Sequence, residues 1–471
     1  MTSRRFQRSM KVFGVLLLTL SSVTPASSVF VIIPGVIQQA GSGVVISLMA
    51  AGLVSFCMAF VYAELASAWP IAGGEYAMAG QALGPFSGYV LLGVNAVTYT
   101  LVPPVLALGA ATYISVIWPN APAVPIAVGM IVVSTFSGIL NVRVNAWVTG
   151  VFLAVEVVAL VVVAALGFAH PARSLAGAIV HPMMATGAGL SATPPLAIAL
   201  STTVAIFALN GYGAAVYFSE EMHEAPAKIA RTIVLALVAT LALEFAPTLA
   251  IVVGAPDLAA TVRSASPFGD FVQALGGRGL AVAVSLAVAF AIVNAVIASL
   301  LINARILYSS GRDGAWHHAV NDIFTRLHLR FDSPWAAMLV TGAAGVACCF
   351  IPLKVLLVLN GMGVVVTYVS MCVSVIAGRL NGSSRHAHYR MPLFPVAPIV
   401  GLLALAGVIA AGWIDTEVGR PSLLATVAEM VLFGGYYLWR RRSAGFAWAM
   451  SGPEDSPPLT EIARNLEVGA S

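Results

Sequence analysis

The first long apolar segment of the chain is interrupted in its middle. Residues 12–37 are long enough to cross a bilayer, but Val23-Thr24-Pro25-Ala26-Ser27-Ser28 stands within them. Pro25 has no backbone N–H and disfavours helical geometry at Thr24. Peptide groups released from a helix cannot face lipid, because each unsatisfied group costs several kcal/mol there. The segment is therefore predicted to be a discontinuous membrane helix whose free peptide groups line a cavity.

Composition indicates that most of the chain lies in a membrane. Of its 471 residues, 59% are hydrophobic and 9% are charged, and the mean hydropathy is +0.94. Such values predict an all-α polytopic membrane protein surrounded by the lipid bilayer. The basic residues are scattered and form no basic face, which argues against a nucleic-acid partner. The cysteines lie inside apolar spans and are expected to be core residues, not disulfides: Cys57, Cys348, Cys349 and Cys372.

Apolar stretches of about 20 residues recur along the chain and predict twelve transmembrane helices. They form a predicted transporter domain over 12–440, between a cytoplasmic segment 1–11 and a polar tail 441–471 that is expected to be cytoplasmic and disordered. The predicted spans are 12–37, 44–69, 86–116, 124–140, 146–169, 198–218, 229–254, 280–308, 335–351, 355–376, 394–414 and 423–439.

Loop charges predict the orientation of these spans. With the N-terminus inside, five of the 23 basic residues fall on the outer side and all others on the inner side, as the positive-inside rule requires. Both termini are therefore expected to be cytoplasmic, in the plasma (inner) membrane. The start of the chain also fits a cleavable signal peptide, but the apolar run resumes at once through 30–37, so a retained helix is expected. The outer basic residues are Arg173, Arg263, Arg278, Lys354 and Arg420.

A second break is predicted in the sixth span, at Asn210-Gly211-Tyr212-Gly213. Glycine inside a helix costs about 1 kcal/mol relative to alanine, and two stand here within three residues. Small residues also permit close helix packing, but a matching break in the first span favours a secondary transporter with inverted repeats. Half-helix N-termini would then attract a carboxylate and unwound carbonyls an ammonium group. The predicted substrate-binding residues are Thr24, Ala26, Ser27, Ser28, Phe207, Asn210 and Gly211, with Phe207 as a lid.

Three glutamates stand in apolar spans. Glu156 lies near the middle of span five and Glu244 within span seven. A charge at bilayer depth costs about 2.5–3.5 kcal/mol on insertion scales, so such residues face a cavity or a partner. Both are candidates for binding a coupling proton; the alternative is a neutral carboxyl that is hydrogen-bonded between helices. Glu64, near the inner end of span two, is expected to be interfacial.

No pattern in the sequence points to an enzyme. All eight histidines lie in loops or at span ends, where they cannot ligate a metal or haem between facing helices. No phosphate-binding Walker A sequence is present, so the chain is not expected to hydrolyse ATP. We expect no metal site and no cofactor.

Several segments resemble the amino acid–polyamine–organocation (APC) permease superfamily. The similarity extends over about residues 12–440 and its motifs occur in the family order. They are YAELASAWPIAGGEY at 62–76, FALNGY at 207–212 followed by Glu220-Glu221 and Ala225-Pro226, NARILY at 303–308, GRDG at 311–314, SPW at 333–335 and YRMPLFP at 389–395.

The resemblance implies a five-plus-five inverted-repeat (LeuT-like) fold with discontinuous helices one and six. The repeats would be roughly 12–170 and 198–376, with two extra helices in 394–439. It also implies uptake or exchange of amino acids or amines. Ala26-Ser27-Ser28 occupies the place of the usual Gly-Ser-Gly of the first helix, so neither glycine is present. Phe207 matches the aromatic gate of helix six, and Glu156 replaces a lysine of some proton-coupled members.

These patterns together predict a secondary active permease that works by alternating access. Its substrate is expected to be one small amino acid, coupled to a proton by symport or moved by exchange. An amine carrier for a polyamine, choline, 4-aminobutyrate or an ethanolamine-like substrate is the first alternative, since a buried glutamate can pair with an ammonium group. A transport-inactive nutrient sensor is the second.

Overall fold

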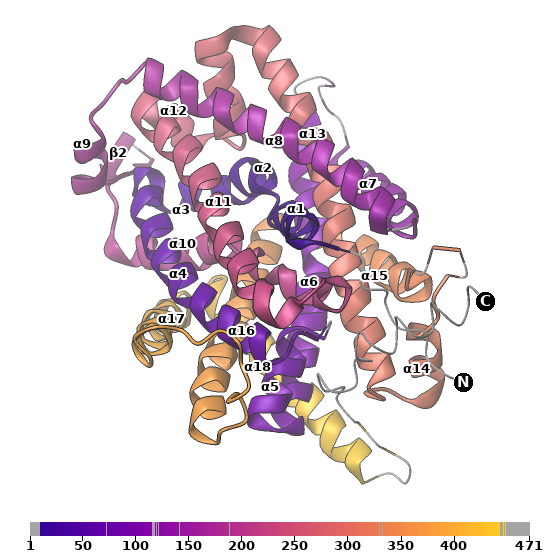
Figure 1. Cartoon of the computed structure of the whole chain (residues 1–471). Helices are drawn as coiled ribbons and strands as arrows, with labels where there is room; N and C mark the ends of the chain where they lie inside the picture. Colours follow the sequence, from indigo (N-terminus) through magenta and orange to yellow (C-terminus); the bar gives the residue numbers. More distant parts are fainter. Residues whose placement is uncertain are drawn as a thin grey trace.

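The computed structural model describes residues 10–71, 73–114, 118, 120, 122–140, 142–187, 189–328, 330, 331, 333–442, 446 and 448. The described part is helical except for one small hairpin (Figure 1). Most of the predicted segment 1–11 and nearly all of the predicted tail 441–471 lie outside the described residues.

The first predicted span is built from four consecutive pieces instead of one helix. They are α1 (Val12–Val23), α2 (Pro25–Ser27), the π-helical turn η1 (Ser28–Ile32) and α3 (Ile33–Ala40). The elements that follow up to the outer loop are η2 (Gly41–Gly43), α4 (Val44–Ala68), α5 (Glu75–Leu83), α6 (Pro85–Ile114), α7 (Ala123–Gly138) and α8 (Val142–Ala169).

The sixth predicted span is likewise divided, into α10 (Pro195–Ala208) and the 3₁₀-helical segment η3 (Tyr212–Glu221). Before it come α9 (Leu175–Val180) and the strands β1 (Met183–Thr186) and β2 (Gly189–Ala192). After it come α11 (Ala225–Gly254), α12 (Leu258–Arg263), α13 (Pro267–Arg312), α14 (His318–Phe324), α15 (Trp335–Cys348), α16 (Leu353–Leu380), α17 (Val396–Ile414) and α18 (Gly419–Arg441).

Each predicted span coincides with one or more helices of the structure, but the number of membrane crossings remains a prediction. Within the described residues, nine helical stretches are long and apolar enough to cross a membrane. One of them, Val12–Ala68, joins the first two predicted spans, while α7 and α15 are apolar but shorter. The chain is therefore an integral membrane protein with many apolar helices.

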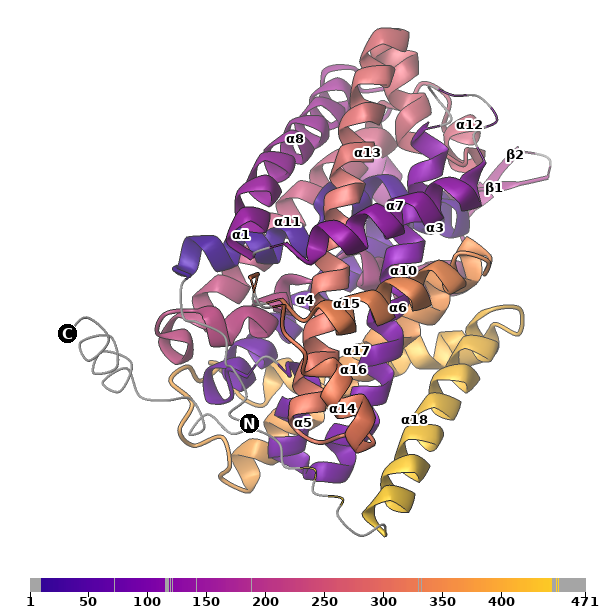
Figure 2. The same cartoon turned by 90° about the vertical axis from the view of Figure 1, so that its right-hand side faces the viewer.

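The helices pack around a centre formed by the broken first span. α6 lies along α13, and α4 and α8 lie along α11. α18 runs at the periphery, and the β1–β2 hairpin projects beside α12 (Figure 2). Peripheral helices expose large apolar side chains, such as Phe136 and Leu403, as a lipid-facing surface requires. The core is contiguous and reaches from α1 to α18.

Two predicted loops contain structure that the sequence patterns did not indicate. The predicted outer loop 170–195 forms α9 and an antiparallel hairpin in which Met183 pairs with Ala192. The predicted loop 255–279 contains α12 and the start of α13, which bends at Gly277 (φ 77°). These segments are too short to show as apolar spans.

Candidate functional site

The first break is a single left-handed residue. Thr24 has φ 48° and ψ 67°, and Pro25 then begins the short helix α2. A non-glycine residue in this region is uncommon; here the Thr24 hydroxyl donates a 2.8 Å hydrogen bond to the Val23 carbonyl. Proline is tolerated at the first position of a helix, where its missing N–H needs no partner. The break at Pro25 predicted from the sequence is thus present, one residue earlier, and Ala26 and Ser27 are helical.

The second break lies where the sequence predicts it. α10 ends at Ala208, and Gly211 has φ 115° before η3 begins. Only glycine adopts such a conformation without strain. Asn210 is held by the Tyr368 hydroxyl, which donates to its Oδ1 at 3.0 Å, and Tyr212 donates to Tyr368 at 2.8 Å. Both Asn210 and Gly211 are half-buried, unlike their fully buried neighbours.

The two breaks contact each other directly. A Cβ atom on Gly211 would lie 2.9 Å from the Cα atom of Val23, so the two chain segments touch backbone to backbone. The Ser28 hydroxyl donates a 2.9 Å hydrogen bond to the carbonyl of Ala208. The discontinuities therefore form one region in the centre of the helix bundle.

The predicted substrate-binding residues all belong to this central region. Thr24, Ala26, Ser27, Ser28 and Phe207 are at most 5% exposed. The Ser27 hydroxyl has no hydrogen-bond partner among the described residues. A buried hydroxyl without a partner is costly, so Ser27 is a buried polar group beside the first break with its hydrogen-bonding capacity unused.

Two buried carboxyl groups flank the first break. Glu156 on α8 and Glu244 on α11 are both 0% exposed, and none of their carboxyl oxygens has a hydrogen-bond partner in the described part of the chain. The backbone amide of Ala26 and the side chain of Asn294 lie near Glu156, and the Ser28 hydroxyl lies near Glu244. α2 contacts α8, α11 and α13. The structure thus brings together two glutamates that are 88 positions apart in sequence.

A third buried carboxyl group was missed by the sequence reasoning. Glu75 at the start of α5 accepts hydrogen bonds from Tyr62 (3.0 Å), Asn95 (3.4 Å) and the hydroxyl of Tyr217. The ring of Tyr217 also fills the space in which a Cβ of Gly74 would stand. Gly74 has φ 62°. In the sequence, Gly73-Gly74-Glu75-Tyr76 stands out only as part of a family motif, because the partners of Glu75 come from α4, α6 and η3.

Glu64, expected to be interfacial, lies near the end of α4 and is buried inside the protein. Its carboxylate is 0% exposed and accepts two hydrogen bonds of 2.6 Å from Arg379 and one of 2.8 Å from the Met391 amide. Arg379 compensates the buried charge, so the side chain does not need water. Further buried or half-buried ion pairs, Arg305–Glu221 and Arg312–Glu220, link α13 to the end of η3.

Metal chemistry has no candidate site in the described residues, where no three His, Cys, Asp or Glu side chains group together. The described cysteines are free; Cys57, Cys349 and Cys372 are buried and Cys348 is half-buried. Their position in the core agrees with the prediction made for them.

The chain matches the sequence profile of amino acid permeases over residues 10–435. It is 30% identical to an uncharacterized transporter of Mycobacterium tuberculosis, over 81% of each chain. It is 24% identical to a methylthioribose transporter of Bacillus subtilis, covering 84% of this chain and 87% of the relative. It is 23% identical to a branched-chain amino acid permease of Lactococcus lactis subsp. cremoris, covering 80% and 84%.

These matches confirm the similarity noted in the sequence motifs. The profile covers both breaks, the flanking glutamates and the Glu75 cluster, and the named relatives are transporters and permeases, not enzymes. The chain therefore belongs to the amino acid permease family of the APC superfamily.

Proposed function

We propose that the protein is a secondary active permease that moves one small amino acid through the membrane by alternating access. The observation that carries this proposal is the contact between the two breaks, Ser28 with Ala208 and Gly211 with Val23. Broken helices that meet at the centre of a bundle place peptide groups where a polar substrate can use them.

The groups for holding the substrate are of two kinds. The carbonyls of Val23 and Ala208, at the ends of α1 and α10, accept hydrogen bonds from side-chain hydroxyls and can exchange them for donors of a substrate. The Ser27 hydroxyl and the Asn210 side chain supply short polar contacts, while Phe207 supplies an apolar wall or lid. Without the two glycines usual in the first helix, less space is left beside residues 26–28, which favours a small substrate.

Glu156 and Glu244 are the proposed proton carriers. A buried carboxyl group that gains a proton in one conformation and loses it in another couples transport to the proton gradient. Both carboxyl groups lie beside residues 26–28, so a movement of α1 and α2 changes their surroundings directly. This arrangement supports proton symport, with exchange as the mode when no gradient is present.

An amine carrier is the second candidate, and the same two glutamates favour it. Neither carboxyl group pairs with a basic side chain among the described residues, so an ammonium group on the substrate could supply the opposite charge. The named relatives include a methylthioribose transporter as well as an amino acid permease, so family membership leaves the substrate class open.

Uptake into liposomes tests the proposal. The purified protein, reconstituted with an inward proton gradient, is expected to accumulate at least one of the twenty radiolabelled L-amino acids, and unlabelled substrate should drive counterflow. Uptake of polyamines, choline or 4-aminobutyrate without uptake of amino acids would select the amine carrier. Binding without any flux would select a transport-inactive sensor. A reporter fused to either terminus tests the proposed cytoplasmic location in the inner membrane.

A further inference from the structure

Aromatic side chains gather at the end of α18 that is predicted to be cytoplasmic. They come from separate parts of the chain: Tyr89 from α6, Trp316 from the connection between α13 and α14, Tyr437 from α18, and Phe446 and Trp448 from the segment after it. The ring centre of Tyr89 is 5.0 Å from that of Trp448 and 6.2 Å from that of Trp316. The ring centre of Tyr437 is 5.3 Å from that of Tyr89 and 5.9 Å from that of Phe446. We call these five residues the α18 aromatic cluster.

The cluster stands where a membrane meets water. α18 is long and apolar enough to cross a membrane, and it ends in three arginines, Arg440, Arg441 and Arg442. Trp439, beside them, is 62% exposed. Tryptophan and tyrosine concentrate at the membrane–water interface, where the lipid headgroups lie. Because α18 runs at the periphery of the bundle, this end of it is open to those headgroups (Figure 2).

Two hydrogen-bond donors at this cluster lack an acceptor. The Nε atom of Arg440 and the Nε1 atom of Trp448 are buried and have no partner among the described residues. The Nη2 atom of Arg440 donates to the Trp316 carbonyl at 3.3 Å, which is long for such a bond. The guanidinium carbon of Arg440 lies 5.2 Å from the centre of the Phe446 ring. A buried unpaired donor costs about 1–3 kcal/mol, and more where it is charged, so the cluster holds a cation that lacks its anion.

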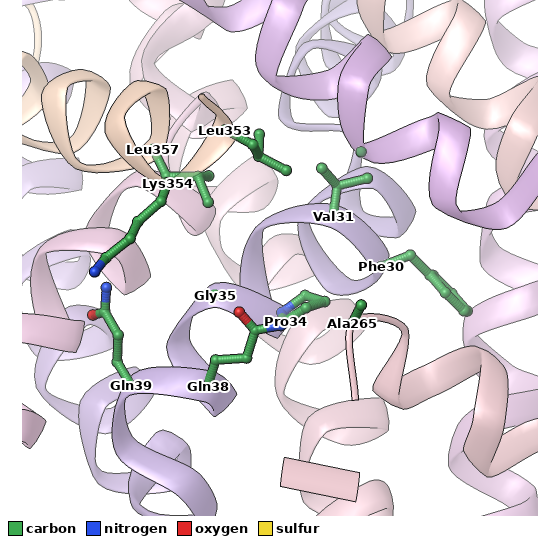
Figure 3. Close-up of a pocket in the computed structure, with 11 residues that line it drawn as sticks. Phe30, Val31, Pro34, Gly35, Gln38, Gln39, Ala265, Leu353, Lys354 and Leu357 are labelled. Carbon is green, nitrogen blue, oxygen red and sulfur yellow. The ribbon is translucent and has the colours of Figure 1, made fainter. Parts of the chain in front are cut away.

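Arg440 differs in this respect from a charged group at the opposite end of the bundle. Lys354 lines a cavity of about 410 Å³ beside α3 there (Figure 3). Its ammonium group lies 3.7 Å from Glu417 and its side chain is 64% exposed, so a carboxylate and water compensate its charge. Arg440 is half-buried and pairs with no carboxylate in the described part of the chain. The surrounding membrane, by contrast, supplies a phosphate with every phospholipid.

We propose that the α18 aromatic cluster binds the headgroup of one anionic phospholipid in the leaflet at this end, which is predicted to be the inner one. The Arg440 guanidinium and the Trp448 indole N–H donate to the phosphate oxygens, as arginine does in other phosphate sites. Arg441 and Arg442 favour a headgroup with net negative charge. The acyl chains then lie along exposed apolar side chains of α18 such as Leu438. The site contains no residue of the two breaks, so it goes beyond the proposed function and does not depend on it.

Lipid-induced thermal stabilisation of the purified full-length protein in detergent tests the site. The anionic probe is dioleoylphosphatidylglycerol, and dioleoylphosphatidylcholine has the same acyl chains with a zwitterionic headgroup. Sodium phosphate tests whether a free anion suffices. A ligand that binds only the native state raises the unfolding temperature with its affinity. The titrations are made in 0.5 M NaCl, because salt screens exposed charges far more than partly buried ones.

Two pairs of variants separate this site from surface charge in general. Arg440→Gln removes the half-buried guanidinium, and Arg442→Gln removes an exposed one two residues later. Trp448→Phe removes the unpaired indole N–H but keeps an aromatic ring, and Trp439→Phe does the same at an exposed position. Arg440→Gln is expected to weaken phosphatidylglycerol binding about tenfold, as loss of one charge-assisted hydrogen bond does, and Trp448→Phe about threefold. Arg442→Gln and Trp439→Phe should keep the wild-type affinity.

The unfolding temperature without lipid shows whether each variant is folded, and Trp448→Phe carries the test if Arg440→Gln is not. The proposal is overturned if Arg440→Gln binds phosphatidylglycerol as tightly as Arg442→Gln does, or if Trp448→Phe binds it as tightly as Trp439→Phe does. Equal binding of phosphatidylcholine would remove the preference for an anionic lipid. Equal stabilisation by sodium phosphate at the same concentration would assign the site to a free anion and overturn the lipid.

Discussion

The hydroxyl of Ser28 donates a 2.9 Å hydrogen bond to the backbone carbonyl of Ala208, the last residue of α10. Carbonyls in the last turn of a helix lack partners within that helix. At bilayer depth no water is present to replace them. One break therefore supplies the donor that the other break requires, and the two discontinuities stabilise each other.

Replacing Ser28 with alanine should destabilise the protein by about 1–3 kcal/mol, because the Ala208 carbonyl is left buried and unpaired. Unfolding of the purified protein in detergent by increasing SDS measures the change. Ser374→Ala is the matched control: Ser374 is also fully buried, but its hydroxyl donates to Ser370 within the continuous helix α16. That carbonyl keeps its helical amide partner, so a loss as large as in Ser28→Ala would contradict the role given to Ser28.

Gly211→Ala should abolish transport. Its φ of 115° is strained for alanine, and the added Cβ would stand 2.9 Å from Cα of Val23 and 3.1 Å from its nitrogen, so the two breaks must move apart. Gly435→Ala in α18 is the control, since a Cβ there meets nothing within 4 Å and alanine favours the helix by about 1 kcal/mol. Initial uptake rates at matched expression compare the two variants. Wild-type rates in Gly211→Ala would show that the contact between the breaks is dispensable.

Glu156→Gln should abolish proton-driven accumulation while leaving counterflow partly intact. Glutamine keeps the size of the side chain but cannot bind and release a proton. Glu244→Gln should act in the same direction, because Glu244 flanks the same three residues from α11. Liposomes that contain a pH-sensitive dye measure substrate and proton movement together. Gradient-driven uptake that is unchanged in both variants would remove these carboxyl groups from the coupling mechanism.

The sequence predicted those parts of the site that depend on local backbone chemistry. Pro25 and Gly211 disfavour a continuous helix through their own backbone chemistry, and a lone glutamate in an apolar span is conspicuous. The Glu75 cluster could not be predicted, because it requires Tyr62, Asn95 and Tyr217 to meet from three separate elements.

Glu64 shows the same limit of sequence-based prediction, namely that partners distant in sequence cannot be foreseen. Its position near a span end suggested contact with water, but its partner Arg379 is 315 residues away in the sequence. Likewise, nothing in the composition of 183–192 distinguishes a hairpin from an irregular loop. Apolar patterns locate spans well, since burial in lipid dominates their energy, whereas polar pairing inside the bundle depends on the tertiary fold.

Tyr217→Phe should reduce stability by about 1 kcal/mol, since it removes one donor to the buried Glu75 and leaves Tyr62 and Asn95 in place. Glu75→Gln should cost more, because one carboxylate oxygen becomes an NH₂ group that faces donors. The SDS-unfolding assay ranks the two variants, and Tyr217→Phe combined with Glu75→Gln should show less than the sum of both losses. Strict additivity would indicate that the two side chains do not act through a shared hydrogen bond.

Glu64→Gln should be among the most destabilising single substitutions in the chain. It leaves the Arg379 guanidinium, packed 4.2 Å from the centre of the Phe394 ring, without the carboxylate that holds it. Removing one member of a buried ion pair costs about 3–5 kcal/mol, and the 19% exposure of Arg379 places the expected loss toward the lower value. Glu417→Gln provides the contrast, since its pair with Lys354 is exposed and its loss should change stability little.

Because Glu64 joins α4 to the end of α16 and to Met391 before α17, its loss should loosen that junction. Hydrogen exchange of the amides near Met391 should then increase in Glu64→Gln and stay at the wild-type rate in Glu417→Gln; equal protection in both variants would show that the Glu64–Arg379 pair does not hold the junction together.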